Sequence, residues 1–118
     1  MRKVVITGLG VVTPLGGDLN SSWKNLISGK SGASTITKFD PTGYPCTIAC
    51  EVPLGDGLNA NDGSFNANDW ISQKDQKKVD TFILYGIAAA EMALKDSGWK
   101  PQTDEDSFRA GVGVGSGI

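Results

Sequence analysis

The sequence predicts an α/β fold of one domain, and three patterns indicate it. A β-branched run from Val4 to Ile6 stands near the start, an alternating stretch covers 46–52, and a glycine-rich strand begins at Ala110. Two segments between these strands, 19–27 and 79–97, carry apolar residues at helical spacing. With 118 residues, the chain has the length of a single domain with one core.

The first strand is expected from Arg2 to Gly8. Its apolar run continues on both faces, which is typical of a buried parallel strand. A glycine-rich loop through Gly17 follows, and the next helix is expected to be capped by Asp18 or Asn20 and to end at Gly29. Its apolar stripe consists of Leu19, Trp23, Leu26 and Ile27.

The middle of the chain is expected to be mostly irregular. Residues 31–68 are rich in Gly, Pro, Asn, Asp, Ser and Thr, with one strand near 46–52 and a long excursion over 55–68. Helical signals return at Ser72, where the order Ser-x-x-Asp resembles a capping box.

A longer helix is expected from Val79 to Ser97, and Gly98 marks its end. Gly86 and the three alanines at 88–90 would let another element pack close to it. The acidic run 104–106 reads as a solvated loop. The apolar stripe of the long helix consists of Val79, Phe82, Ile83, Ile87, Ala90 and Leu94.

Composition excludes several classes of function. The chain has 13 acidic and 11 basic residues and a net charge of -2, which argues against a protein that mainly coats nucleic acid phosphates. No apolar run is long enough for a membrane span. Histidine is absent, so a Ser-His-Asp triad, a Cys-His pair and a His-based zinc site are excluded within the chain. Neither a cofactor nor a metal is expected.

The two cysteines are expected to be reduced. In a strand, the α-carbons of Cys46 and Cys50 would lie about 13 Å apart, which is too far for a disulfide. They read as small buried residues on a strand face, since no histidine is present to activate either thiol.

Two motifs are candidates for binding. The Gly8-Leu9-Gly10 turn after a strand invites a dinucleotide-binding interpretation, but Thr13 stands where the third glycine is required. The other motif consists of Lys74, Lys77 and Lys78, which fall at i, i+3 and i+4 and so share one helical face. By spacing alone, these lysines favour ordinary solvated surface over a binding site.

Taken together, the segments of the chain closely resemble the β-ketoacyl-acyl-carrier-protein synthases. The opening from Val4 to Gly16 carries the resemblance first. The later matches follow in the same order: Trp23 with Leu26, 29–32, Phe39-Asp40, the helix over 72–80, 96–98 and 113–118. Details at 45–46, 52–53 and 96–102 look most like the mitochondrial branch of the family.

This resemblance implies a thiolase-like fold, layered α-β-α-β-α in the complete homodimeric enzyme. Residues 1–118 would form the incomplete N-terminal part of the N-terminal domain, truncated before the catalytic cysteine. The family moves an acyl group from acyl carrier protein to that cysteine and condenses it with malonyl carrier protein in fatty acid biosynthesis. The chain alone is therefore expected to be poorly folded and inactive.

The resemblance assigns roles to four residues, none of them catalytic and none holding a cofactor or metal. Ile118 matches a residue that lines the acyl-chain pocket, and Lys74, Lys77 and Lys78 match a basic stretch that meets the acidic carrier protein. No nucleic acid or membrane partner is implied. A non-catalytic carrier-protein-binding fragment is the alternative function, followed by a nucleotide-binding domain. The mitochondrion is the expected compartment, with the bacterial cytoplasm or a plastid as alternatives.

Overall fold

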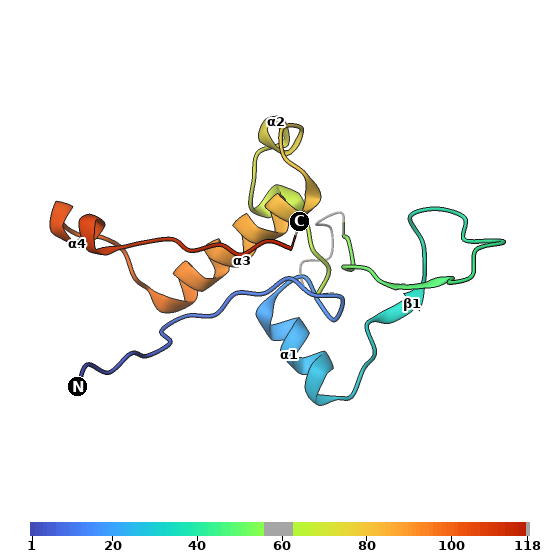
Figure 1. Cartoon of the computed structure of the whole chain (residues 1–118), viewed down its shortest axis with the longest axis horizontal. Coiled ribbons are helices and arrows are strands. Elements are labelled where there is room, and N and C mark those ends of the chain that lie inside the picture. The colour runs from blue at the N-terminus through green and yellow to red at the C-terminus, as the bar shows by residue number, and fades with distance from the viewer. Residues whose placement is uncertain (56–62, 118) are drawn as a thin grey trace.

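The computed structural model describes residues 1–55 and 63–117 (Figure 1). The elements in chain order are α1 (Leu19–Ile27), β1 (Ala33–Thr35), β2 (Ile48–Cys50), the 3-10 helix η1 (Ala67–Asp69), α2 (Gln73–Gln76), α3 (Thr81–Ser97) and α4 (Asp104–Arg109). The two strands form an antiparallel sheet in which Ser34 lies opposite Ala49. The described part of the chain is therefore a mixed α/β structure.

The molecule has a small centre from which several segments extend. Its principal extents are 57 × 36 × 33 Å and its radius of gyration is 17.1 Å, whereas a compact domain of this length has about 13.5 Å. In Figure 1, the N-terminal segment and α4 reach away on one side of the centre, and the β1–β2 sheet reaches away on the other. The centre consists of α1, α3 and the turns between them.

The N-terminal segment lies directly on α3. A β-carbon at Gly8 would overlap the carbonyl oxygen of Ala93, and one at Gly10 would overlap that of Ala89. The amide of Leu9, between the two glycines, donates a hydrogen bond of 2.9 Å to the Asp96 carboxylate. The glycines are therefore required because backbone meets backbone here, with no room for side chains.

The turn from Thr13 to Gly16 and the helix α1 continue this packing. Thr13 and Gly16 exchange two backbone hydrogen bonds of 2.9 and 3.0 Å, which closes a tight turn. As expected, Asp18 caps α1, its side chain accepting a hydrogen bond from the Ser21 amide. The buried hydroxyl of Ser22 donates to the Gly16 carbonyl over 3.1 Å, and this bond fixes α1 against the turn.

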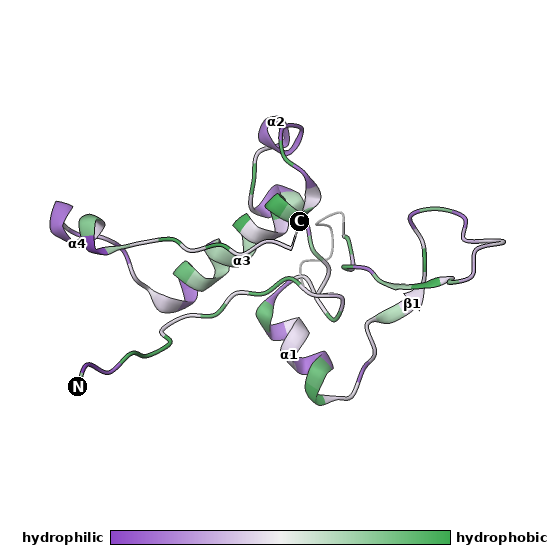
Figure 2. Ribbon diagram, in the orientation of Figure 1, coloured by the Kyte–Doolittle hydropathy of each residue, from purple (hydrophilic) through white to green (hydrophobic). Residues whose placement is uncertain are grey.

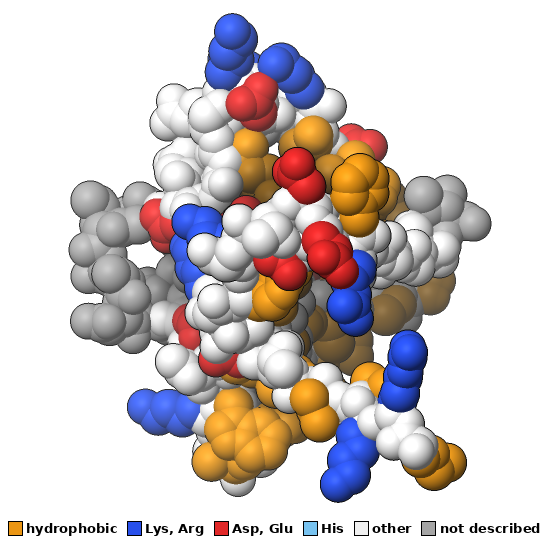
Figure 3. Space-filling model, turned by 90° about the vertical axis from the view of Figure 1, so that its left-hand side faces the viewer, with side chains coloured by type: hydrophobic (Ala, Val, Ile, Leu, Met, Phe, Trp, Pro, Cys, Tyr) orange, Lys and Arg blue, Asp and Glu red, His pale blue; other side chains and the backbone are white. Residues whose placement is uncertain are grey.

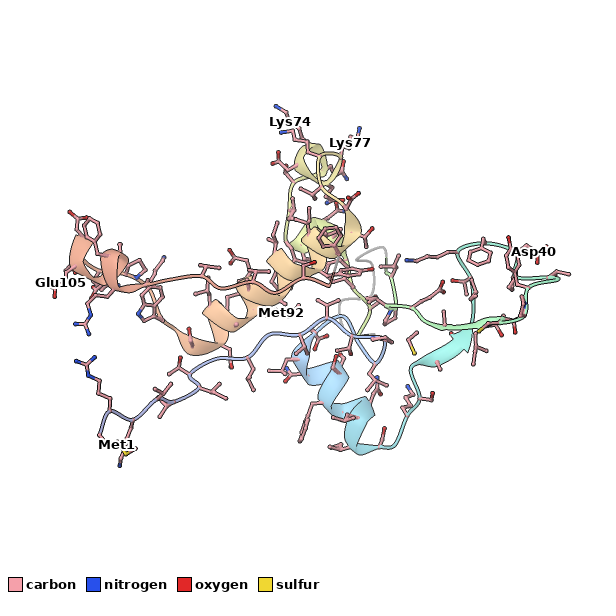
Figure 4. The ribbon with its side chains drawn as sticks, viewed as in Figure 1. Met1, Asp40, Lys74, Lys77, Met92 and Glu105 are labelled. Carbon is pink, nitrogen blue, oxygen red and sulfur yellow. The ribbon has the colours of Figure 1, made fainter. Side chains whose placement is uncertain are left out.

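The core of the described residues is small. Its buried apolar members are Phe65, Ala88 and Met92. Tyr85 packs edge-on against Phe65, with ring centroids 5.0 Å apart and planes at 88°. Figure 4 shows Met92 on α3, where the N-terminal segment passes.

The long helix has the expected bounds within two residues, but it buries a different face from the expected one. Gly98 ends α3 with φ of 62°, as its position predicted. The expected stripe is exposed at Phe82 (54%) and Leu94 (45%), while Ala88 and Met92 on another face are buried. The alanines of that second face let the N-terminal backbone approach the helix, and Met92 is buried beside them.

The strands expected at 2–8 and from Ala110 are wrong in this structure. Both segments are without strand pairing and exposed, including Val4 (96%) and Val112 (94%). A strand requires a hydrogen-bonded neighbour, and no described segment lies alongside either one as a partner. The apolar residues of these segments therefore stay exposed, and Figure 2 shows the hydrophobic colouring along the N-terminal one.

Three smaller expectations also change. Cys46 and Cys50 are both free, as expected, but they are exposed: Cys50 ends β2 and Cys46 lies in the loop before that strand. The acidic run 104–106 is helical, since Thr103 and Asp106 form a capping box at the start of α4. The apolar stripe of α1 is largely exposed, with Ile27 at 67%.

Replacing Gly10 with Ala is expected to destabilise the complete protein by about 1 to 3 kcal/mol, because the added methyl group would press on the backbone of α3. Chemical denaturation of the two proteins measures the difference. Gly111→Ala is the matched control, since a β-carbon there meets no atom within 4 Å. Equal stability of Gly10→Ala and the unchanged protein would contradict the close packing.

Candidate functional site

The lysines singled out from the sequence lie on a projecting part of the molecule. Lys74 belongs to α2, Lys77 is its C-terminal cap and Lys78 follows directly. All three are exposed. Figure 4 shows Lys74 and Lys77 pointing outward from the tip of α2, away from α3, and Figure 3 shows basic side chains gathered at the same end of the molecule. We call residues 72–78 the basic turn.

The basic turn is helical because of its first residue. The Ser72 hydroxyl accepts a hydrogen bond from the Asp75 amide and donates one of 2.7 Å to the Asp75 carboxylate. This resembles the expected capping box, except that the carboxylate is bonded to the hydroxyl of Ser72. An acidic group in the first turn also suits the helix dipole. The helix is shorter than expected and ends at Gln76.

Two contacts fix the basic turn to the rest of the structure. The side-chain amide of Gln76 donates to the Ile71 carbonyl over 2.8 Å and to the Asn68 side chain over 3.0 Å. Just before the turn, the Trp70 ring lies under the Lys95 ammonium of α3, which is 4.6 Å from the ring centroid. A cation over an indole face is attracted by the ring electrons. The turn therefore has a defined position relative to α3.

The three lysines differ in their surroundings. The Lys78 ammonium forms an ion pair of 2.8 Å with the Asp75 carboxylate. Lys74 and Lys77 have no ion-pair partner within residues 1–55 and 63–117. The Lys78 ammonium, and then the Ser72 hydroxyl, lower the pKa of the Asp75 carboxyl by hydrogen bonding, so that this group is ionised at neutral pH.

This arrangement is suited to contact an acidic surface. Three ammonium groups and one carboxylate give the basic turn a net charge of +2. The sequence indicated the lysines, but not the pairing of Lys78, because the expected continuous helix placed Asp75 off the lysine face. The Trp70 contact with Lys95 joins residues 25 positions apart, and no local pattern signals it.

Ile118, the expected acyl-pocket residue, lies outside the described residues. The segment before it forms an apolar groove of about 430 Å³ with α3. Phe82, Ile83 and Ile87 line the helix side of this groove, and Val112 and Val114 line the other.

The described residues offer no condensing chemistry of their own. Cys46 donates a long thiol hydrogen bond of 3.4 Å to the Ile48 carbonyl, and Cys50 is exposed on β2. Activation of a thiol usually requires a nearby cation or a helix N-terminus. No group of three metal-ligating side chains occurs in the part of the chain that the structure describes. None of the helices in that part is long and apolar enough to cross a membrane.

Comparison with known proteins gives a consistent result. The family described as "Beta-ketoacyl synthase, N-terminal domain" matches residues 1–118. A 3-oxoacyl-acyl-carrier-protein synthase 2 of Rhizobium meliloti is 52% identical over 118 residues, which are 100% of this chain and 27% of that protein. The mitochondrial 3-oxoacyl-acyl-carrier-protein synthase of Arabidopsis thaliana is 37% identical over 131 residues, covering 99% of this chain and 27% of that protein.

A solved structure agrees with these relatives. The ishigamide ketosynthase/chain length factor matches 89% of this chain and 23% of its own, with 34% identity and a TM-score of 0.67. This likeness confirms the expected fold class, the N-terminal part of a thiolase-like α/β fold. The chain spans about a quarter of the length of the relatives it matches. It belongs to the β-ketoacyl synthase family and matches the family's N-terminal domain.

Proposed function

We propose that the complete protein is a β-ketoacyl-acyl-carrier-protein synthase of fatty acid biosynthesis. The observation that carries this proposal is the match of all 118 residues, at 52% identity, to a protein named for that activity. In this reaction a cysteine thiolate takes the acyl group from a carrier-protein thioester. Malonyl carrier protein then loses carbon dioxide, and the resulting carbanion attacks the acyl thioester and releases the cysteine.

The described residues support a docking role in that reaction. They contain no histidine, and both of their cysteines are free and exposed, Cys50 in β2 and Cys46 in the loop before it. The catalytic groups would therefore belong to other parts of the complete protein. What this chain offers is the basic turn, and we propose that it contacts the acidic surface of the carrier protein through Lys74, Lys77 and Lys78.

The alternative functions differ in how well the structure supports them. A carrier-protein-binding fragment without catalysis would use the same basic turn. The structure does not favour the nucleotide-binding interpretation, because Gly8 and Gly10 lie against the backbone of α3 and α1 begins only at Leu19. A pyrophosphate would need the free amides of a helix that opens directly on the glycine turn.

The compartment and the assembly stay predictions. We propose a mitochondrial homodimer. Both mitochondrial and bacterial proteins are among the relatives, and the Rhizobium protein has the higher identity of the two compared above. Cell fractionation decides the compartment, and a bacterial source or a cytosolic signal would contradict the prediction.

Light scattering of the complete protein measures the oligomeric state, and the mass of a monomer would contradict the proposed homodimer.

The complete protein is expected to release carbon dioxide from malonyl carrier protein when a carrier protein loaded with an acyl group is also present. The isolated 118-residue chain is expected to release none, because it lacks the histidines that stabilise the carbanion. Radiolabelled malonyl substrate measures both. Release by the isolated chain would show that catalysis resides here, and no release by the complete protein would favour the non-catalytic alternative.

Changing Lys74, Lys77 and Lys78 together to Glu is expected to raise the apparent KM for carrier-protein substrates by about five- to thirty-fold, since three exposed ion pairs together contribute on the order of 1 to 2 kcal/mol. Steady-state assays at low salt measure this change, which should shrink as salt screens the charges. Small thioester substrates provide the control, and their KM should stay nearly constant. Equal loss on both substrate types would assign the lysines to the fold.

Replacing Ile118 with Phe in the complete protein is expected to shorten the acyl chains that it accepts. The resemblance places Ile118 in the acyl pocket, and overfilling a packed site costs about 1 to 3 kcal/mol. Competition between short and long acyl primers measures the preference. An unchanged preference would contradict the assignment of Ile118 to the acyl pocket. The control is the conservative change Ile118→Val, which should leave the accepted chain lengths nearly unaffected.

A further inference from the structure

We propose that Asp75 is a specificity-determining residue that limits how tightly the basic turn holds its acidic partner, by competing with that partner for Lys78. This inference rests on the proposed docking of carrier protein. It assigns a role to an acidic residue in the middle of a basic surface.

Asp75 binds one of the three lysines, Lys78, directly. One carboxylate oxygen lies 2.8 Å from the Lys78 ammonium, and the other accepts a hydrogen bond of 2.7 Å from the Ser72 hydroxyl. The second bond orients the carboxylate, so that it does not swing freely away from Lys78. An approaching acidic side chain must therefore displace Asp75, or bind beside it without the use of Lys78.

The ion pair of Asp75 and Lys78 contributes little to the stability of the fold. The side chains of Lys78 and Asp75 are 61% and 55% exposed; Asp75 lies in the four-residue helix α2, and Lys78 follows just past its end. Ion pairs with this exposure add little to the stability of a fold. The Asp75 carboxylate has a larger effect on the binding of a charged partner, since its removal would raise the net charge of the basic turn from +2 to +3.

Such competition suits a partner that must leave. A carrier protein delivers a substrate and must dissociate before the next can bind, and related interfaces differ mainly in dissociation rate. A carboxylate that recaptures Lys78 as the partner withdraws would favour dissociation. Lys74 and Lys77, which have no ion-pair partner among the described residues, would then contribute most to the encounter.

Asp75→Asn is the variant that separates this role from a structural one. The amide keeps an oxygen that can accept from the Ser72 hydroxyl, and the backbone amide that caps the helix is unchanged. Asp80→Asn is the matched control. Asp80 is also acidic and close to the turn, but its side chain makes no capping hydrogen bond and pairs with none of the three lysines in the described structure.

The experiment measures binding of holo acyl carrier protein to the complete protein by surface plasmon resonance at low and at high salt. Asp75→Asn is expected to bind about two- to five-fold more tightly at low salt, mainly through slower dissociation, in line with the range for exposed ion pairs. The gain should shrink at high salt. Asp80→Asn should gain less. When Lys78→Gln is also present, Asp75→Asn should gain no more than Asp80→Asn does, because only the general charge effect is left.

Three results would overturn the inference: no gain from Asp75→Asn, an equal gain from Asp80→Asn, or a gain from Asp75→Asn that is undiminished with Lys78→Gln. The triple change of Lys74, Lys77 and Lys78 to Glu, measured in the same way, separates this from the docking proposal. If the triple variant binds weakly and Asp75→Asn is unchanged, docking stands and the competition fails. If the triple variant binds as tightly as the unchanged protein, both fail.

Discussion

The close approach of the N-terminal segment to α3 is the constraint on which the rest of the structure depends. Gly8 and Gly10 are the positions where the segment touches the helix, and no larger residue fits at either. The Leu9 amide bound to Asp96 fixes the register of the two elements. The segment then turns at Thr13 to Gly16 and leads into α1, whose buried Ser22 is bonded to that turn.

The same constraint continues into the core and toward the basic turn. Gly17 meets the backbone of Phe65 so closely that a side chain would not fit, and Phe65 in turn packs on α3 through Tyr85. From Phe65 the chain runs along α3 to Trp70, where Lys95 covers the ring. The candidate docking surface is thus positioned by α3, although its lysines form no hydrogen bond or ion pair with that helix in the described structure. Structure and proposed function are connected through this one helix.

The sequence predicted those features that depend on local interactions. Asp18, Ser72 and Gly98 lie at helix ends as expected, because a cap requires only its neighbours in the chain. The strands were less predictable, since strand formation depends on partners that are distant in sequence. The β-branched run at 4–6 is extended and exposed, with no described strand beside it.

The candidate site was also predicted only in part. Its lysines could be found from their spacing and from the family resemblance. The pairing of Lys78 with Asp75 was missed, although the two residues stand at i and i+3, a spacing at which side chains meet on a helix. The buried face of α3 was predicted incorrectly. The apolar stripe is the stronger local signal, but the N-terminal backbone packs against the face that carries Ala88, Ala89 and Met92.

Amide hydrogen exchange of the complete protein, with and without acyl carrier protein, tests the central claim most directly, namely that this part of the chain docks the carrier. We predict slower exchange over residues 70–80 when the carrier protein is bound, and unchanged exchange in the β1–β2 sheet. Protection elsewhere in the complete protein, with none over residues 70–80, would contradict the account.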